Sequence, residues 1–323
     1  MEKATRGFKK KTIVGATEFK MKAWIKTIKD ASLQKKVSDD FIVTGGAIAS
    51  MLLGELPNDY DVYMRTKDTA KALAEYYLQD VKPSTNLNCK TVVEDTTDGR
   101  GVKIYIKSAG VAGYGTDLSD YRYFECLPPG EADKYLRRHI KKPKADYQLA
   151  LASSNALSLT GDVQVVLRFC GPPEEIHKNY DFAHATNYYS RASGLVLNQE
   201  ALECTLAREL KYVGSLYPVC SMFRTKKFIE RGWTITAGEM LKIAWDINKL
   251  DLNSIAVLQE QLIGMDSAYF HQVLHLLKVP DNGEIDRTYL FELINRVFDD
   301  ANPLRDQDDD NDGPDNQDNQ VEG

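Results

Sequence analysis

The fold is decided by the stretch Phe41-Ile-Val-Thr-Gly-Gly-Ala-Ile-Ala-Ser-Met-Leu-Leu-Gly-Glu-Leu-Pro-Asn-Asp-Tyr-Asp-Val-Tyr63. Its first four residues are apolar or β-branched and predict a short strand. The pair Gly45-Gly46 then predicts a tight turn, and residues 47–53 predict a helix. Residues 60–65 alternate in polarity and predict a second strand. The stretch therefore predicts a strand, a glycine turn, a helix and a second strand in succession.

The chemistry of this unit lies in its glycines and in two acids. Gly45 and Gly46 let a phosphate approach the backbone closely, and the start of the following helix favours an anion. Asp59 and Asp61 are two residues apart, so both carboxylates are expected on one face of the second strand. Such a pair can hold Mg²⁺ ions about 4 Å apart, or Mn²⁺ in their place, which activate a hydroxyl and neutralise a leaving pyrophosphate. Ser50 can add a hydroxyl to the nucleotide-binding residues.

The spacing resembles the head domain of bacterial poly(A) polymerases and CCA-adding enzymes, within the DNA polymerase beta superfamily. Gly46 precedes Asp59 by 13 positions, as in that family, and Leu52-Leu53-Gly54 falls in register. The resemblance implies a nucleotidyltransferase head in which Asp59 and Asp61 are catalytic metal ligands. It also implies transfer of a nucleotidyl group from an NTP to a hydroxyl acceptor, with release of pyrophosphate. A nucleic-acid 3′ end, and RNA above other acceptors, is the partner expected.

The chain departs from the family pattern within the helix. The family usually carries an Arg-Asp pair there, whereas this chain has Ala49-Ser50. This departure supports a second hypothesis, in which the head fold is kept, catalysis is lost, and the protein is a nucleic-acid-binding or structural component, for instance of a virion. A plainer interpretation takes Gly45-Gly46 as an ordinary turn and the two acids as solvated residues at a strand edge.

The superfamily normally adds a third acid from a neighbouring strand. Residues 163–168 have the pattern of that strand, but they offer Gln164, which cannot act as a base. Asp181 lies between two aromatic residues at an expected strand start, and it is the favoured third carboxylate, as metal ligand or base. Glu125 is a weaker alternative, and a capping or turn role is the plain interpretation of Asp181.

Cations cluster after Pro218, where Arg224 and Lys227 stand among aromatic residues, together with Lys226 and Arg231. A basic helix beside the site would bind the triphosphate through Arg224 and Lys227, or a nucleic-acid backbone. An ordinary solvated helix face explains the same pattern equally well.

The length of 323 residues suits about two domains. Through residue 197 the chain alternates between helical and strand patterns, and from 198 to 304 the patterns are helical. Residues 305–323 are nearly devoid of apolar side chains, so we expect them to be disordered. The predicted fold is therefore α+β, with a nucleotidyltransferase head of mixed sheet and flanking helices (1–197), an all-α domain (198–304) and an acidic tail (305–323).

The net charge of −6 belongs to the tail. Residues 306–323 hold seven Asp and one Glu without Lys or Arg, which leaves +2 for the rest. The five cysteines are scattered, which is typical of reduced thiols and gives no support to a zinc site. We see neither a signal peptide nor an apolar run of roughly 18 residues. The sequence thus predicts a cytoplasmic protein without a membrane partner. It is also similar to phage nucleotidyltransferase-like proteins, which favours the host cytoplasm.

Overall fold

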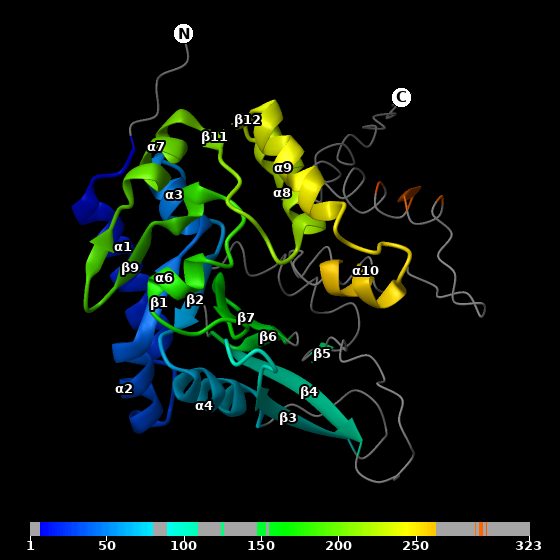
Figure 1. Ribbon diagram of the computed structural model, residues 1–323. Coiled ribbons are helices and arrows are strands. Elements are labelled where there is room, and N and C mark those ends of the chain that lie inside the picture. The colour runs from blue at the N-terminus through cyan, green and yellow to red at the C-terminus, as the bar shows by residue number, and fades with distance from the viewer. Residues whose placement is uncertain are drawn as a thin grey trace, which may run out of the picture. The chain divides into compact units, whose positions relative to one another are not determined.

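The structure is a computed structural model that describes residues 7–79, 89–108, 124–125, 147–152, 155–262, 288, 291–292 and 295. By its contacts the chain divides into one unit over Met1–Leu250 and another over Asp251–Gly323. The fold is α+β, as predicted, with a mixed sheet and flanking helices in the first unit (Figure 1). Most of the predicted helical segment beyond residue 262, and the whole acidic tail, lie outside the described residues.

Eight strands form one sheet in the order β10-β9-β1-β2-β8-β7-β6-β5. In that order they span Gly194–Val196, Tyr188–Ser190, Phe41–Thr44, Tyr60–Met64, Val163–Val166, Ala156–Leu159, Leu149–Ala152 and Phe124–Glu125. Neighbours are antiparallel except β2 and β8, which are parallel. The strands predicted at 41–44, 60–65 and 163–168 are confirmed as β1, β2 and β8. Because β1 and β2 lie at the centre, the unit predicted from residues 41–63 organises the sheet.

Two smaller strand pairs are described. They are the antiparallel pair β3 (Cys89–Asp95) and β4 (Val102–Ser108), and the parallel pair β11 (Glu209–Leu210) and β12 (Thr234–Ile235). The described helices are α1 (Lys10–Ile25), α2 (Ala31–Asp40), α3 (Gly46–Leu52), α4 (Lys67–Leu78), α6 (Pro173–His177), the 3₁₀ helix η1 (Ala183–Thr186), α7 (Gln199–Ala207), α8 (Pro218–Glu230), α9 (Ala237–Ile247) and α10 (Ile255–Leu262). A search of the described residues found no helix that is both long and apolar enough to cross a membrane.

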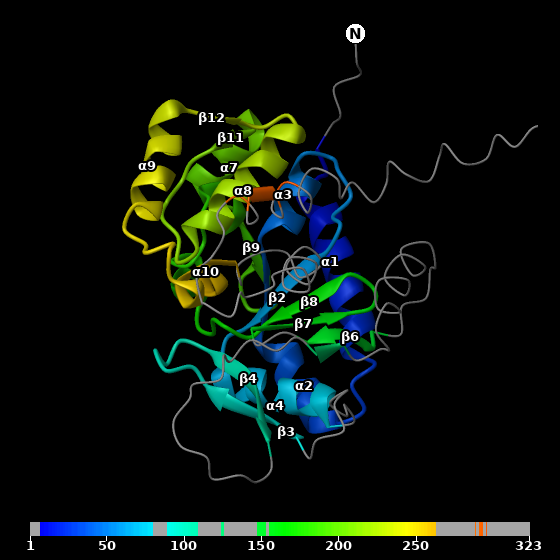
Figure 2. The ribbon, with the colours of Figure 1, turned by 90° about the vertical axis from the view of Figure 1, so that its right-hand side faces the viewer.

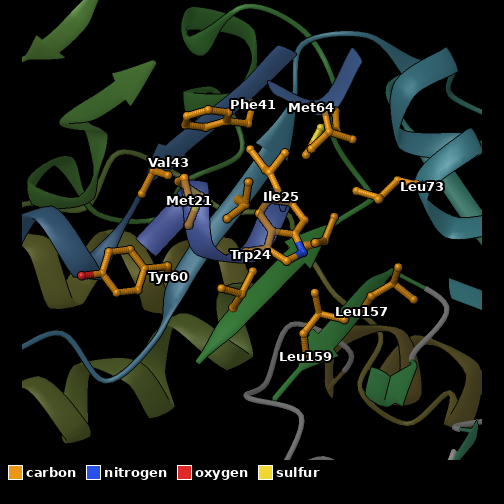
Figure 3. Close-up of a cluster of buried hydrophobic side chains, with 14 of the residues drawn as sticks. Met21, Trp24, Ile25, Phe41, Val43, Tyr60, Met64, Leu73, Leu157 and Leu159 are labelled. Atoms are coloured by element: carbon orange, nitrogen blue, oxygen red, sulfur yellow. The ribbon is translucent and has the colours of Figure 1, made fainter. Parts of the chain in front are cut away.

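One face of the sheet packs on α1, α2 and α4 (Figure 2). Side chains alternate along a strand, so Val43 of β1 and Met64 of β2 point to this face and are fully buried. Trp24 of α1 and Leu73 of α4 are buried against them (Figure 3). The indole Nε1 of Trp24 donates to the hydroxyl of Tyr77 over 2.9 Å, so the large ring is buried without an unpaired polar atom. This layer is the main hydrophobic core.

The opposite face of the sheet has a smaller core. Ile42, Tyr63 and Tyr188 are buried there, and Ile176 of α6 packs against them. By the same alternation, Asp61 projects from this face two residues before Tyr63. Asp61 therefore lies on the face of the sheet opposite to α1, α2 and α4.

Beyond the boundary predicted near residue 198, the described elements are helices together with the strands β11 and β12, and packing continues across this position. α7 packs against α3 and η1. Phe182, Tyr212 and Trp233 form one buried cluster, in which Ile243 of α9 also takes part. Residues 199–250 therefore pack with the head, in the unit that ends at Leu250.

Candidate functional site

The pairing of β1 with β2 brings the glycine turn and the acid pair together. Thr44, the last residue of β1, lies opposite Asp61 in the antiparallel register. Gly45 follows with φ 88° and ψ −151°, a conformation open essentially to glycine alone. A Cβ on Gly45 would lie 3.0 Å from Oδ2 of Asp61. Position 45 therefore requires glycine for two reasons, its backbone angles and its closeness to the Asp61 carboxylate.

The two predicted catalytic acids differ in exposure. Asp59 directly precedes β2 and is exposed, whereas Asp61 lies within β2 and is half-buried. Gly46, the first residue of α3, is exposed, and no atom lies within 4 Å of a Cβ built on it. The open space at Gly46, one residue after the glycine that lies beside the Asp61 carboxylate, leaves room for a ligand group.

Gly45 and Gly46 are expected to respond differently to substitution. We expect Gly45→Ala to lower the free energy of unfolding by roughly 1–3 kcal/mol, because its backbone conformation is strained for any side chain. Gly46→Ala should leave stability unchanged or raise it by about 0.5–1 kcal/mol, because the position is helical. Gly46→Val should weaken NTP binding without unfolding the protein. Denaturant unfolding and NTP titration of the three variants check this, and equal losses of stability at both glycines would contradict it.

Aromatic and imidazole groups lie directly behind the acids. The rings of Tyr63 and Tyr180 are 6.0 Å apart, and the Tyr180 hydroxyl would lie 3.7 Å from a Cβ on Gly45. Burial raises the pKa of Tyr63, and the charge of Asp61 raises it further. Both phenols therefore stay protonated. Asp61 thus lies beside two neutral phenols, a feature that the sequence analysis did not predict.

His177 packs beside the same aromatic group, with its ring 5.3 Å from that of Tyr180. Its Nε2 lies 2.9 Å from the Thr44 hydroxyl, which also lies within hydrogen-bonding distance of two backbone carbonyls, those of Ala185 and Asn187. Burial lowers the pKa of His177 to about 4, against a small opposing effect of Glu174. The imidazole is therefore neutral at physiological pH. Its contact fixes the end of β1, from which the glycine turn begins.

Asp181, the predicted third carboxylate, is buried and forms an ion pair. Arg224 of α8 donates from Nη1 to its Oδ2 over 2.5 Å. The backbone carbonyl of Asp181 accepts from Val213, which fixes the segment in place. Arg224 is itself half-buried, with 40% of its side chain exposed. The structure therefore brings together two predicted site residues, Asp181 and Arg224, that are 43 positions apart.

The strand beside β2 is the one predicted, and Gln164 lies next to Asp61 in the parallel register of β2 and β8. Glu125 lies in β5 at the far edge of the sheet, four strands away from β2. Within the described ranges, no three His, Cys, Asp or Glu side chains are grouped so that they could hold a metal. Asp59, Asp61 and Asp181 therefore do not form such a group in the described part of the chain, and the Asp181 carboxylate is paired with Arg224.

Ser50 and Lys227 occupy different surroundings. Ser50 is buried in α3, and its carbonyl accepts from the backbone of Leu53 and Glu55. Its hydroxyl is therefore remote from solvent. Lys227 is half-buried and lies three residues after Arg224 on α8, so the two cations lie on neighbouring positions of one helix face.

The loop that carries Asp59 is tied to two other segments. Glu55 accepts from Arg208 over 2.7 Å and from Arg231 over 3.2 Å. Arg208 ends α7 and Arg231 ends α8. The carboxylate of Glu55 therefore fixes the loop between α3 and β2 against both helix ends.

This contact supports a prediction of modest size. Glu55→Gln should lower kcat/KM for nucleotidyl transfer by about tenfold through displacement of Asp59, a loss of about 1.4 kcal/mol. The stability cost should stay under about 1 kcal/mol, because the ion pairs are partly exposed. Glu230→Gln, which removes an exposed acid of α8, is the control. Steady-state kinetics of both variants test this, and unchanged activity of Glu55→Gln would refute a positioning role.

The first unit contains, in chain order, the central strand β1, the glycine turn, helix α3 and strand β2, which follows Asp59 and contains Asp61. Among solved structures, the chain is similar to the Thermotoga maritima CCA-adding enzyme complexed with tRNA, with a TM-score of 0.41 and 12% identity, covering 89% of this chain and 65% of that one. It is also similar to the Bacillus stearothermophilus CCA-adding enzyme in complex with CTP, with a TM-score of 0.38 and 13% identity, covering 80% of this chain and 52% of that one. The chain spans between half and two thirds of the length of these enzymes.

A match to a family model identifies the family of this chain. The model of the Gabija anti-defense 2 family matches residues 16–208, which is more than half of the chain. The chain belongs to the Gabija anti-defense 2 family. No curated protein matches it.

Proposed function

We propose that the protein transfers a nucleotidyl group from an NTP to a hydroxyl acceptor, with release of pyrophosphate. The observation that carries this proposal is that Gly45 lies close to the Asp61 carboxylate. A Cβ atom at Gly45, which glycine lacks, would lie 3.0 Å from Oδ2 of Asp61. A backbone turn open to phosphate, directly beside a carboxylate on a rigid central strand, is the arrangement that a metal-bound triphosphate needs.

Asp59 and Asp61 would hold the Mg²⁺ or Mn²⁺ ion. Their hard, anionic oxygens suit these cations, and the exposure of Asp59 leaves coordination positions for water and substrate phosphates. When bound, the ion supplies positive charge to the triphosphate and to the attacking oxygen. Arg224 and Lys227 add two fixed cations for the phosphates. The acceptor oxygen forms a bond to the α-phosphorus of the NTP. The bond between the α-phosphorus and the oxygen that bridges to the β-phosphate breaks, and pyrophosphate leaves.

Asp181 is proposed as the acid on the acceptor side. Its carboxylate would take the proton of the attacking hydroxyl, and Arg224 would hold it in position. Both Asp61 and Asp181 raise the pKa of the Tyr63 phenol through their charge, which supports placing these two acids around one site. Ser50 has no part in this proposal, because its side chain is buried and its carbonyl accepts from the backbone of Leu53 and Glu55.

The acceptor proposed is a nucleic-acid 3′ end, with RNA favoured, on the basis of the sequence resemblance. The name of the family describes an action against a defence called Gabija, and we propose that nucleotidyl transfer serves this action. The cytoplasm of a phage host is the place where it would occur. Incubation with each radiolabelled NTP, Mg²⁺ and a mixed pool of RNA and protein tests the proposal. Labelled product that depends on Asp61 supports it, and the chemical nature of that product names the acceptor.

Two observations favour a second candidate function. Gln164 lies beside Asp61 where an acid would complete the site, and Ala49-Ser50 replaces the charged pair of the resembled family. A head that lost catalysis would still bind nucleic acid or act as a structural component. Thermal unfolding separates the two functions, because a ligand that binds the folded state raises its stability. A shift with NTP and Mg²⁺ supports the enzyme, and a shift with nucleic acid alone supports the binding protein.

A further inference from the structure

The two N-terminal helices carry a charge opposite to that of the whole chain. Nine lysines and two acidic residues lie between Lys9 and Lys36, a net charge of +7 in a protein of net charge −6. These residues form α1, the start of α2 and the turn between the helices, which lie side by side at one edge of the first unit (Figure 1). All but one of these lysines are exposed, so this charge faces solvent.

The solvent side of α1 has an ordered arrangement. Lys11, Gly15, Phe19, Lys22 and Lys26 follow one another at intervals of three or four residues, which places them along one side of the helix. The other side is buried in the main core. Phe19 is 77% exposed, although it is a large apolar side chain. We call these five residues the lysine face.

The lysine face is open to a ligand. A Cβ on Gly15 would meet no neighbouring group within 4 Å, so this side of the helix is open at Gly15. Lys22 forms a salt bridge of 2.6 Å with Glu18, and 63% of its side chain is exposed. Such an exposed pair contributes little stability, so a phosphate can replace the carboxylate at low cost.

We propose that the lysine face binds the sugar–phosphate backbone of single-stranded nucleic acid, with Phe19 stacked on a base. The lysines span a length of roughly 22 Å along the helix, from 15 residues at about 1.5 Å each. A positive track that follows the backbone, with an aromatic ring for the bases, is the chemistry of single-strand binding. A base-paired strand would leave no unstacked base for Phe19. This inference rests on the proposed function, because the strand bound here would be the acceptor of the nucleotidyl group.

The test is the binding of a fluorescent single-stranded RNA of about 20 nucleotides to the full chain, followed by anisotropy at several salt concentrations. The variant Lys11→Gln/Lys22→Gln/Lys26→Gln should bind at least tenfold more weakly. The slope of log affinity against log salt should fall by about 2, since each lost phosphate contact removes about 0.7. Phe19→Ala should weaken binding about tenfold with the slope unchanged, because stacking releases no counterions.

The matched control replaces three exposed lysines outside α1 and α2, Lys178, Lys242 and Lys249, by Gln. It should bind as the parent does, and all variants should unfold at the parent temperature. Asp61→Asn should keep RNA binding, so a failure of the proposed catalysis is distinguishable from a failure of this surface. Parent affinity and parent slope in the α1 variant would overturn the proposal. So would equal binding of duplex RNA, or lysine-dependent binding of anionic lipid vesicles in place of RNA.

Discussion

Asp61→Asn is expected to lower the turnover number for nucleotidyl transfer by roughly 10³-fold while the protein stays folded. Asparagine keeps the shape of the side chain and removes the negative charge that Mg²⁺ prefers. Asp61 lies beside Gly45 on the central strand β2, so its charge faces the proposed phosphate position. Asp59→Asn should have an effect of the same order. Because Asp59 is exposed, that variant should cost little stability.

Transfer is measured with a radiolabelled NTP at saturating Mg²⁺, and folding by thermal unfolding of each variant. Asp39→Asn, which changes an exposed acid near the end of α2, is the matched control and should keep the parent rate. Parent activity of the Asp59 and Asp61 variants would show that this site is not catalytic. The binding hypothesis would then take the place of the enzymatic one.

Local features of the site could be predicted because they depend on neighbouring residues. The strand, glycine turn and helix follow from hydrophobic pattern and from the freedom of glycine. The closeness of Gly45 to Asp61 follows from the antiparallel pairing of β1 and β2, once both strands are identified. Gln164 lies beside Asp61 for the same reason, since the segment predicted as the neighbouring strand forms β8 over Val163–Val166.

Other features depend on chain segments that meet only in the folded state. Nothing near Asp181 indicates Arg224, because their ion pair joins a loop to a helix 43 positions later. The aromatic group beside Asp61 could have been predicted in part. Tyr63 lies two residues after Asp61 on the same strand, so its side chain must lie on the same face of the sheet. His177 offered no such signal. Its role depends on the packing of α6 near the end of β1.

The segment that forms α1 and α2 has a continuous apolar pattern, which hides the boundary between the two helices. Apolar residues at helical spacing continue through Ile28 to Leu33, yet α1 ends at Ile25 and α2 begins at Ala31. Asp30 caps the second helix, as its side chain accepts from the backbone of Ser32 and Leu33. Asp is a preferred N-cap residue, so this signal was present in the sequence. Both helices bury the same core, which keeps the apolar pattern continuous across the break.

Asp181→Asn is expected to lower kcat by roughly 10²–10³-fold and to change KM for the NTP by less than about tenfold. This split follows from the proposed place of Asp181 beside the attacking hydroxyl, where it takes a proton in the chemical step. Arg224→Gln should mainly raise KM, because a phosphate contact is lost. It should also lower kcat, though less than Asp181→Asn does, because Asp181 loses the contact that holds it. The two side chains are joined over 2.5 Å, so their effects should not add in the double variant.

Steady-state kinetics of the two variants and of their double variant measure this split, together with the pH profile of kcat. A base in the chemical step gives an acid limb to the profile, and Asp181→Asn should flatten it. Suppose instead that Asp181→Asn raises KM as much as Arg224→Gln does and leaves the acid limb in place. Asp181 would then serve only to hold the arginine for the triphosphate. The proton of the acceptor would have to leave by another route, since the neighbour of Asp61 on β8 is the amide of Gln164.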